Sequence, residues 1–192
     1  MAMAATSRDD EAEWLYSQLM AGAAGTGNDQ VVACIYASWS SGAGAMPDWL
    51  GLTPVGFKRL MAHHFPGARL GATPNPGRAL PVARRDEVED LVRLMWQHRA
   101  EDSLTVRWMA ELVAAGCLGS DHLWQDLGLW SRADLTALMR RNFPSLAALN
   151  TKDMKWKRFL YRQLCETEGI RLCRSPSCEE CCDYHVCFGP ED

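Results

Sequence analysis

The sequence predicts an all-α fold: a helical body built from two duplicated units, then a C-terminal helix and an irregular, cysteine-rich metal-binding tail. Apolar residues recur at spacings of three and four, and no segment alternates β-branched and polar residues as a strand would. Five cysteines crowd into residues 173–187, where turn-forming residues replace the helical pattern. With 192 residues and 47% hydrophobic content, the chain can form one domain with a sizeable core.

Local start and stop signals support the helices of the body. Thr53-Pro54 joins a capping side chain to a proline at the first helical position, and Ser131 precedes another helical segment in the same way. Phe65-Pro66 and Phe143-Pro144 are expected to end two helices. These signals are local, so they predict helix ends without reference to the rest of the fold.

The body also contains an internal repeat. Residues 8–15 (RDDEAEWL) align with residues 84–91 (RRDEVEDL), and both copies later carry an LGL turn and a closing FP pair. Chance similarity between amphipathic helices is the alternative, but the matched LGL and FP favour duplication. The prediction is therefore one domain, residues 1–192, in five parts: helical unit 1 (8–66), a Gly/Pro connector (67–83), helical unit 2 (84–144), a basic helix (150–168) and a Cys-rich cluster-binding tail (169–192).

Charge and hydropathy exclude several classes. No apolar run approaches the roughly 18 residues that span a bilayer, and the start of the chain lacks the basic region of a signal peptide. We therefore expect a cytoplasmic protein without a membrane partner. The net charge of −4 argues against a duplex-binding protein, so no nucleic-acid partner is expected. No nucleophile–base pair, phosphate-binding glycine loop or metalloprotease helix is visible, so no enzymatic activity is expected.

A basic segment leads into an acidic tail. Residues 140–174 hold nine Lys and Arg against three Asp and Glu, whereas residues 175–192 hold five acids and no Lys or Arg. The basic residues are candidates for contact with a partner or an oxyanion, although a solvated helix face is the alternative. The candidates on the basic helix are Lys152, Lys155, Lys157, Arg158 and Arg162.

The tail cysteines have the spacing of metal ligands. Cys173, Cys178, Cys181 and Cys187 are separated by four, two and five residues. The two-residue gap lets two thiolates of one turn reach a single centre. In a reducing compartment a metal site is favoured over a disulfide knot. Four ligands within fifteen residues favour an iron–sulfur cluster over structural zinc, and the spacing leaves both open.

The remaining thiols and one histidine have weaker assignments. Cys182 adjoins Cys181 and is expected to point away from the centre that Cys181 binds, which leaves it as an accessory candidate. His185 is a second accessory candidate, with a surface histidine as the alternative. Cys34 and Cys117 are expected to be small core residues.

The C-terminal region resembles the NifQ family. The family's C-x4-C-x2-C-x5-C motif is filled by the four cysteines above, and MKWKRFLYRQLC upstream and CFG downstream also look like family sequence. The resemblance implies a protein that carries molybdenum in an iron–sulfur cluster, of [3Fe-4S] or [4Fe-4S] type, held by those four cysteines. It further implies donation of the molybdenum, taken up from molybdate or another source, to the NifEN/NifH machinery that assembles the iron–molybdenum cofactor of nitrogenase.

Two other classes remain as alternatives. Some helical DNA glycosylases end in a cysteine cluster that holds a structural [4Fe-4S] centre, and the two-and-five spacing fits them. The first gap of four and the missing glycine-rich helix–hairpin–helix signature argue against that class. A zinc-binding interaction domain is the other alternative, and metal analysis separates all three.

Overall fold

The computed structural model describes residues 8–68, 77–167 and Cys187, and these residues form helices without any strand. The helical elements lie in this order: α1 (Arg8–Ala21), α2 (Asp29–Ser40), the 3-10 turn η1 (Asp48–Gly51), α3 (Pro54–His64), the 3-10 turn η2 (Val82–Arg84), α4 (Arg85–Gln97), α5 (Leu104–Gly116), α6 (Leu123–Leu127), α7 (Arg132–Asn142), α8 (Pro144–Leu149) and α9 (Trp156–Thr167). The expected all-α class is thus confirmed. None of the described helices is long and apolar enough to cross a membrane.

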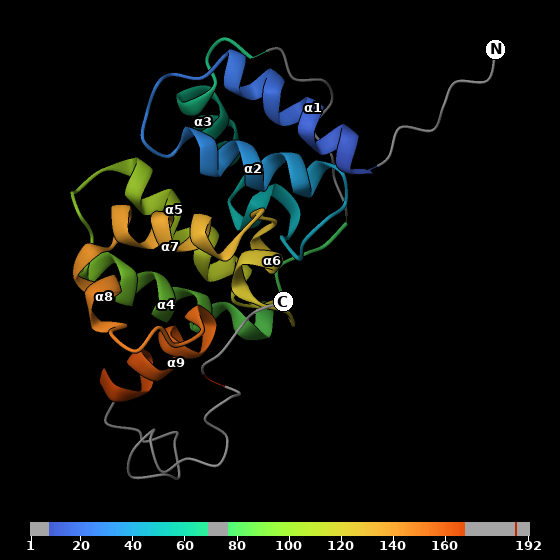
Figure 1. The fold of residues 1–192 in the computed structure, drawn as a ribbon. Helices are drawn as coiled ribbons and strands as arrows, with labels where there is room; N and C mark the ends of the chain where they lie inside the picture. Colours follow the sequence, from blue (N-terminus) through green and yellow to red (C-terminus); the bar gives the residue numbers. More distant parts are fainter. Residues whose placement is uncertain (1–7, 69–76, 168–186, 188–192) are drawn as a thin grey trace, which may run out of the picture.

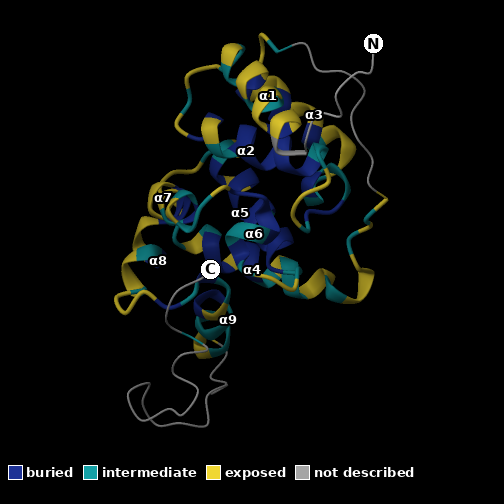
Figure 2. Ribbon diagram, turned by 45° about the vertical axis from the view of Figure 1, so that its right-hand side comes forward, coloured by how far each residue is buried: buried dark blue, intermediate teal, exposed yellow. Residues whose placement is uncertain are grey.

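The centre of the body is built on α2 and α5, the two helices whose residues are buried on nearly every side. Their sequences, DQVVACIYASWS and LTVRWMAELVAAG, are rich in small and apolar residues, as a helix surrounded by neighbours requires. Partly exposed helices cover them: α1 packs on α2, and α4 and α6 pack on α5. Figure 2 shows buried residues concentrated along these inner helices, with exposed residues on the outer ones. In Figure 1, α9 lies at the end of the body opposite α1.

The predicted helix ends at the two FP pairs are confirmed. Phe65 follows α3 with φ −132° and ψ 58°, and Phe143 follows α7 with φ −135° and ψ 58°. Each of these phenylalanines donates its N–H to the carbonyl of a methionine four residues earlier, Met61 and Met139. Both side chains are buried, so each helix ends where its chain turns into the core.

Other features recur between the two halves at nearly the same offset, 78 residues for Thr53 and Ser131 and 77 for Gly51 and Gly128. Thr53 and Ser131 both accept a backbone N–H at a helix start, as predicted. The glycines of both LGL turns have positive φ, 81° at Gly51 and 75° at Gly128, a conformation that only glycine adopts without strain. The carbonyls that end α3 and α7 each accept an N–H from a preceding loop at 2.8 Å. The two halves therefore share turn and cap geometry at these positions.

The expected basic helix over 150–168 begins later than predicted. Residues 150–155 form a loop in which Asn150 accepts the Met154 N–H and donates to the Met154 carbonyl, both at 2.8 Å. Asp153 has φ 53°, a left-handed conformation that cannot continue a helix. The helix therefore starts at Trp156.

Candidate metal centre at the start of α9

Helix α9 is fixed to the body by its apolar face. Trp156, Phe159 and Leu160 are at most 3% exposed and belong to the same core as α4 and α5. Their spacing of three and four places them on one side of the helix. The indole N–H of Trp156 donates to Thr136 Oγ1 of α7 at 3.0 Å, so its polar atom is satisfied in the core. The first turn of α9 is therefore held in place against the body by packing and by this hydrogen bond.

Two polar clusters hold the flank of α9. The Lys157 ammonium donates to the carboxylate of Asp126, which is 1% exposed, and to the carbonyls of Gly119 (3.0 Å) and Asp121 (2.7 Å). One turn later, the Tyr161 hydroxyl donates to Glu87 of α4. These bonds join the last helix to segments more than thirty residues earlier in the chain.

The second cluster is completed by a bidentate ion pair. Arg84 contacts both carboxylate oxygens of Glu87 at 2.6 Å, and its third nitrogen donates to the Leu118 carbonyl at 2.9 Å. The hydrogen bond from Arg84 lowers the pKa of Glu87, although burial acts in the opposite direction. Burial and the bond to Glu87 raise the pKa of Tyr161, so its proton stays in place.

The loop that leads into α9 is fixed as well. Arg132, at the start of α7, forms a fork with Asp153, with Nη1–Oδ2 at 2.7 Å and Nη2–Oδ1 at 3.0 Å. The same guanidinium donates to the Asp153 carbonyl at 3.0 Å. Together with the Asn150–Met154 bonds, this fork sets where Lys155 lies. The helix start is thus determined by the loop itself and by Arg132 of α7.

Cys187 lies at this helix start. Its carbonyl accepts the backbone N–H of Lys155, the residue before α9, at 2.9 Å. Its side chain is half-buried and packs against the hydrophobic core. The structure therefore brings the last of the four predicted ligands to the N-terminal end of α9, although thirty residues separate Cys187 from Lys157 in the sequence.

The other predicted ligands, Cys173, Cys178 and Cys181, lie outside the described residues, as do the accessory candidates Cys182 and His185. Within the described ranges, no three His, Cys, Asp or Glu side chains come together as a metal site would require. The four-cysteine site thus remains a prediction from the sequence.

Electrostatically, the start of α9 suits an anion. The N-terminal end of a helix carries partial positive charge, and acids are normally favoured there. The first turn of α9 contains no acid, and Lys155, Lys157 and Arg158 lie in or next to it. Asp126 offsets the charge of Lys157, while Arg158 is exposed and Lys155 is half-buried. The remaining positive charge would stabilise an anionic group beside Cys187.

The other basic candidates have different surroundings. Arg162 forms an ion pair with Glu166 at 2.7 Å, one turn along the exposed face of α9. Lys152 is exposed in the loop before the helix. The ammonium of Lys157, by contrast, donates three hydrogen bonds within the chain. The residues predicted as one basic set therefore differ in their surroundings: Lys152 and Arg158 are exposed, Lys155 and Arg162 are half-buried, and Lys157 holds the fold.

The cysteines assigned to the core are confirmed there. Cys34 and Cys117 are 6% and 1% exposed, and burial raises the pKa of each thiol to about 12. Sequence reasoning missed the residues that support the α9 start, Asp126, Arg132 and Asn150. Their partners lie far away in the sequence or depend on a left-handed loop residue, so no local pattern marks them.

Comparison with known proteins finds a family match that includes α9 and Cys187. The NifQ family model matches residues 31–189, which run from α2 through Cys187. Protein NifQ of Azotobacter vinelandii is 45% identical over 167 residues, 82% of this chain and 86% of the relative. Protein NifQ of Klebsiella pneumoniae is 36% identical over 78% of this chain and 92% of the relative, and that of Rhodobacter capsulatus is 34% identical over 79% and 82%. No solved structure matches.

The described residues define a helical protein. Its candidate cysteine-ligated centre lies at the start of α9, beside basic residues. The chain belongs to the NifQ family.

Proposed function

We propose that this protein is an accessory protein of nitrogen fixation that carries molybdenum in a Mo-Fe-S cluster. It donates the molybdenum to the NifEN/NifH machinery that assembles the iron–molybdenum cofactor. The observation that carries the proposal is the place of Cys187, a thiol of the family motif, at the positively charged start of a firmly held helix. The proposal assigns no catalytic turnover: the protein binds its cargo and releases it in the cytoplasm.

The ligand set is Cys173, Cys178, Cys181 and Cys187, with an iron–sulfur cluster of [3Fe-4S] or [4Fe-4S] type. The described thiol fits this role because soft thiolates suit iron–sulfur clusters and the Cys187 side chain is only half-buried. When bound, such a cluster would supply the sulfide and iron to which molybdenum attaches. The chain supplies the thiolates and the fixed helix start beside them.

Lys155 and Arg158 supply the compensating charge. Burying or concentrating anionic thiolates is costly unless positive charge lies nearby. The same two residues can draw in molybdate, an oxyanion, or contact an acidic surface of the recipient. We assign Lys157 a different task, because its ammonium already binds Asp126 and two carbonyls and holds α9 in place.

The body that carries this site is proposed to consist of two duplicated helical units. Support comes from the matching backbone angles at Phe65 and Phe143 and from the shared positive φ of the LGL glycines. Each unit would then contribute one of the central helices, α2 and α5. The second unit differs in that its closing proline, Pro144, is the first residue of α8.

The decisive experiment is elemental analysis with EPR of protein that is produced with molybdate and purified without oxygen. Iron together with molybdenum supports the carrier, iron alone leaves a structural cluster open, and zinc without iron would overturn the proposal. Cys178→Ala, Cys181→Ala and Cys187→Ala should each abolish the brown colour and the cluster signal. Cys182→Ala is the matched control, since it should keep iron near the wild-type level; an equal loss would mean that the ligand set is wrong.

A further inference from the structure

The loop before α9 contains a left-handed residue that an arginine of another helix holds. Asp153 has φ 53°, a conformation that non-glycine residues rarely adopt, although Asp tolerates it better than most. A glycine would adopt it more easily, so the backbone conformation alone does not require an acid here. The carboxylate provides what a glycine lacks, acceptors for both terminal nitrogens of Arg132 at 2.7 and 3.0 Å. Asp153 therefore combines the turn with an attachment to α7.

This attachment fixes an orientation as well as a position. The Arg132 guanidinium also donates to the Asp153 carbonyl at 3.0 Å, so it contacts the side chain and the peptide of the same residue. A planar guanidinium binds a carboxylate in one preferred geometry, which the point charge of a lysine does not impose. Arg132 itself is the first residue of α7, whose Leu135 and Leu138 are buried in the core. The fork therefore connects the loop to a firmly packed helix.

The fork contributes little to the stability of the fold. The Asp153 side chain is 72% exposed and that of Arg132 is 25% exposed. Exposed ion pairs are screened by water and usually add little to the free energy of unfolding. The pair between Lys157 and Asp126 is different, because its carboxylate is buried and it holds the same end of α9. A bidentate attachment that adds little stability indicates a task in local geometry.

The residue that this loop orients is Lys155. Its neighbours in the sequence, Met154 and Trp156, are 6% and 3% exposed, so the backbone is held on both sides of it. The Lys155 N–H donates to the Cys187 carbonyl at 2.9 Å, which attaches Cys187 to the body. A chain of direct contacts therefore leads from Arg132 through the Asp153 and Lys155 peptides to the last cysteine of the motif.

We infer that Arg132 and Asp153 are positioning residues for the metal centre. The fork holds the loop in the conformation that presents the Lys155 N–H to Cys187, and it thereby fixes where the fourth thiol lies. This inference rests on the proposed function, in which Cys187 is a ligand of the cluster. Arg132 and Asp153 are not ligands themselves, because they act through the Lys155 peptide. Removing a group that orients a metal ligand typically lowers metal affinity by about 10–100-fold.

The inference predicts a specific defect. In a cluster that takes one protein thiolate for each iron, displacement of one thiolate leaves one iron less firmly held. The three remaining cysteines of the motif lie in the sequence before Cys187 and have no link to the fork in that argument. Loss of the fork should therefore leave cluster assembly possible and make one iron easier to remove.

The test measures iron release to a chelator from protein reconstituted with iron and sulfide without oxygen. The variants are Arg132→Ala, Asp153→Gly and the double variant. Asp153→Gly keeps the left-handed backbone accessible and removes the carboxylate. Each single variant should release its first iron about tenfold faster than the wild type. The double variant should release it no faster than either single variant, because the two residues act as one fork.

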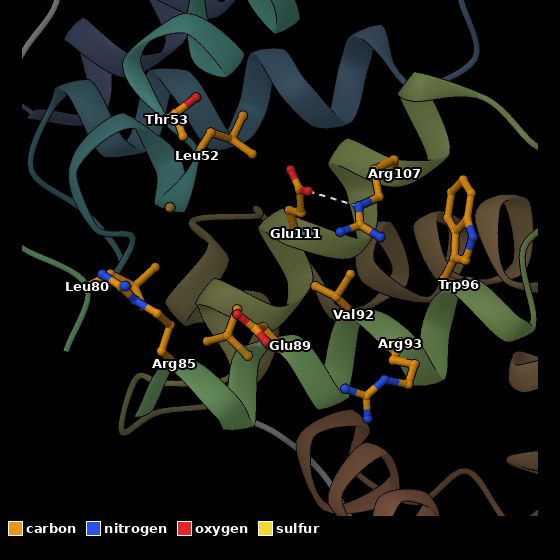
Figure 3. A pocket seen from close by; sticks show the side chains of 12 residues that line it. Leu52, Thr53, Leu80, Arg85, Glu89, Val92, Arg93, Trp96, Arg107 and Glu111 are labelled. Atoms are coloured by element: carbon orange, nitrogen blue, oxygen red, sulfur yellow. Dashed lines mark hydrogen bonds and ion pairs between the residues drawn. The ribbon is translucent and has the colours of Figure 1, made fainter. Parts of the chain in front are cut away.

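Arg107→Ala is the matched control. Arg107 binds Glu111 at 2.9 Å in another exposed pair, marked by the dashed line in Figure 3. This pair lines a groove of about 640 Å³ whose other lining residues come from α4 and from the segments near η1 and Leu80, and not from the loop before α9. The control should leave iron release unchanged. Urea unfolding should show only small stability changes in the control and in the fork variants, so faster release cannot be attributed to global unfolding.

A second readout needs no metal. In the metal-free protein, hydrogen exchange of the Lys155 amide, followed by NMR, reports its bond to Cys187. Exchange should be about tenfold faster in Arg132→Ala and Asp153→Gly than in the wild type, if the fork holds this peptide as strongly as a group that orients a metal ligand. The amides of Leu138 and Leu160, inside α7 and α9, should keep their protection.

The outcomes separate this inference from the proposed function. A wild-type protein that holds no iron–sulfur cluster would overturn the proposed function and the inference with it. A wild-type cluster whose iron release is unchanged in both single variants would overturn the inference alone. Wild-type behaviour of Asp153→Gly would do the same, because the left-handed turn would then suffice. Faster Lys155 exchange without faster iron release, or additive effects in the double variant, would also overturn it.

Discussion

His64 Nδ1 lies 2.7 Å from Asp29 Oδ1, and both side chains are buried, with 0% and 2% of their residues exposed. This pair joins the end of α3 to the start of α2. The other ring nitrogen, Nε2, is buried and has no hydrogen-bond partner within the part of the chain that the structure describes. A neutral imidazole that donates from Nδ1 satisfies this arrangement, because its bare Nε2 needs no acceptor. Protonation would place a second N–H in the core without a partner.

We expect this pair to make stability depend on pH. Burial lowers the pKa of His64 despite its bond to Asp29, so the unfolded chain binds a proton more readily than the folded one. The free energy of unfolding should therefore fall as pH drops below the unfolded value of about 6.5, by at most about 1.4 kcal/mol per pH unit for one proton. Urea unfolding followed by circular dichroism between neutral pH and mildly acidic pH measures this slope.

His64→Asn is the matched variant, since Asn142 occupies the corresponding buried position before the second FP pair. It should be less stable at neutral pH and should lose the part of the slope due to His64. Equal slopes in the two proteins would show that another group is responsible. Asp29 contributes only at lower pH. Burial acts to raise its pKa, but the bonds from Thr26 and His64 outweigh burial, so that stability is lost as pH falls below about 3.9.

Lys157→Met should destabilise the fold strongly. The substitution leaves the Asp126 carboxylate buried without its cation, and breaking such a pair costs about 3 kcal/mol. Chemical denaturation measures the loss. The neighbouring Arg158→Met serves as the control and should change stability by less than about 0.5 kcal/mol, because Arg158 is exposed. A comparable loss in both variants would contradict the assignment of Lys157 to the fold.

Reversing the charge of Lys155 and Arg158 should impair the centre without unfolding the body. Lys155→Glu/Arg158→Glu replaces positive with negative charge at the start of α9, so both molybdenum loading and transfer should fall, by about tenfold if the local charge contributes 1.4 kcal/mol. Metal content after anaerobic loading is the readout, with Arg140→Glu on the exposed face of α7 as control. Unchanged loading and transfer would mean that these residues form only a solvated face.

The core thiols should be inert in the native protein. Because burial raises the pKa of Cys34 and Cys117 to about 12, neither thiol is ionised or accessible at neutral pH. Alkylation with iodoacetamide followed by peptide mass spectrometry should find both unmodified until denaturant is added, whereas Cys187, half-buried, should react in metal-free protein. Modification of Cys117 in the folded state would contradict its burial.

Helix ends could be predicted from local sequence signals. Ion pairs between residues far apart in the sequence could not. Thr53 and Ser131 act within three residues of themselves, and the prolines of the FP pairs restrict the backbone of the residue before them, so sequence reasoning located these helix ends. The start of α9 was misplaced because the left-handed Asp153 depends on Arg132, 21 residues away. Lys157 was grouped with exposed cations because its partner Asp126 lies 31 residues away. Residue type predicts charge, but only the fold decides whether that charge faces a ligand or a carboxylate.

Two adjacent residues at the start of α2 hold both halves of the body. Asp29 binds His64 at the end of α3. The side-chain amides of Asn28 and Asn142, at the end of α7, donate hydrogen bonds to each other at 2.8 and 3.0 Å. Opening either helix end therefore disturbs the same dipeptide and weakens the other attachment. The two halves should consequently not fray independently, and the backbone amides of α3 and α7 should exchange with solvent as one cooperative unit.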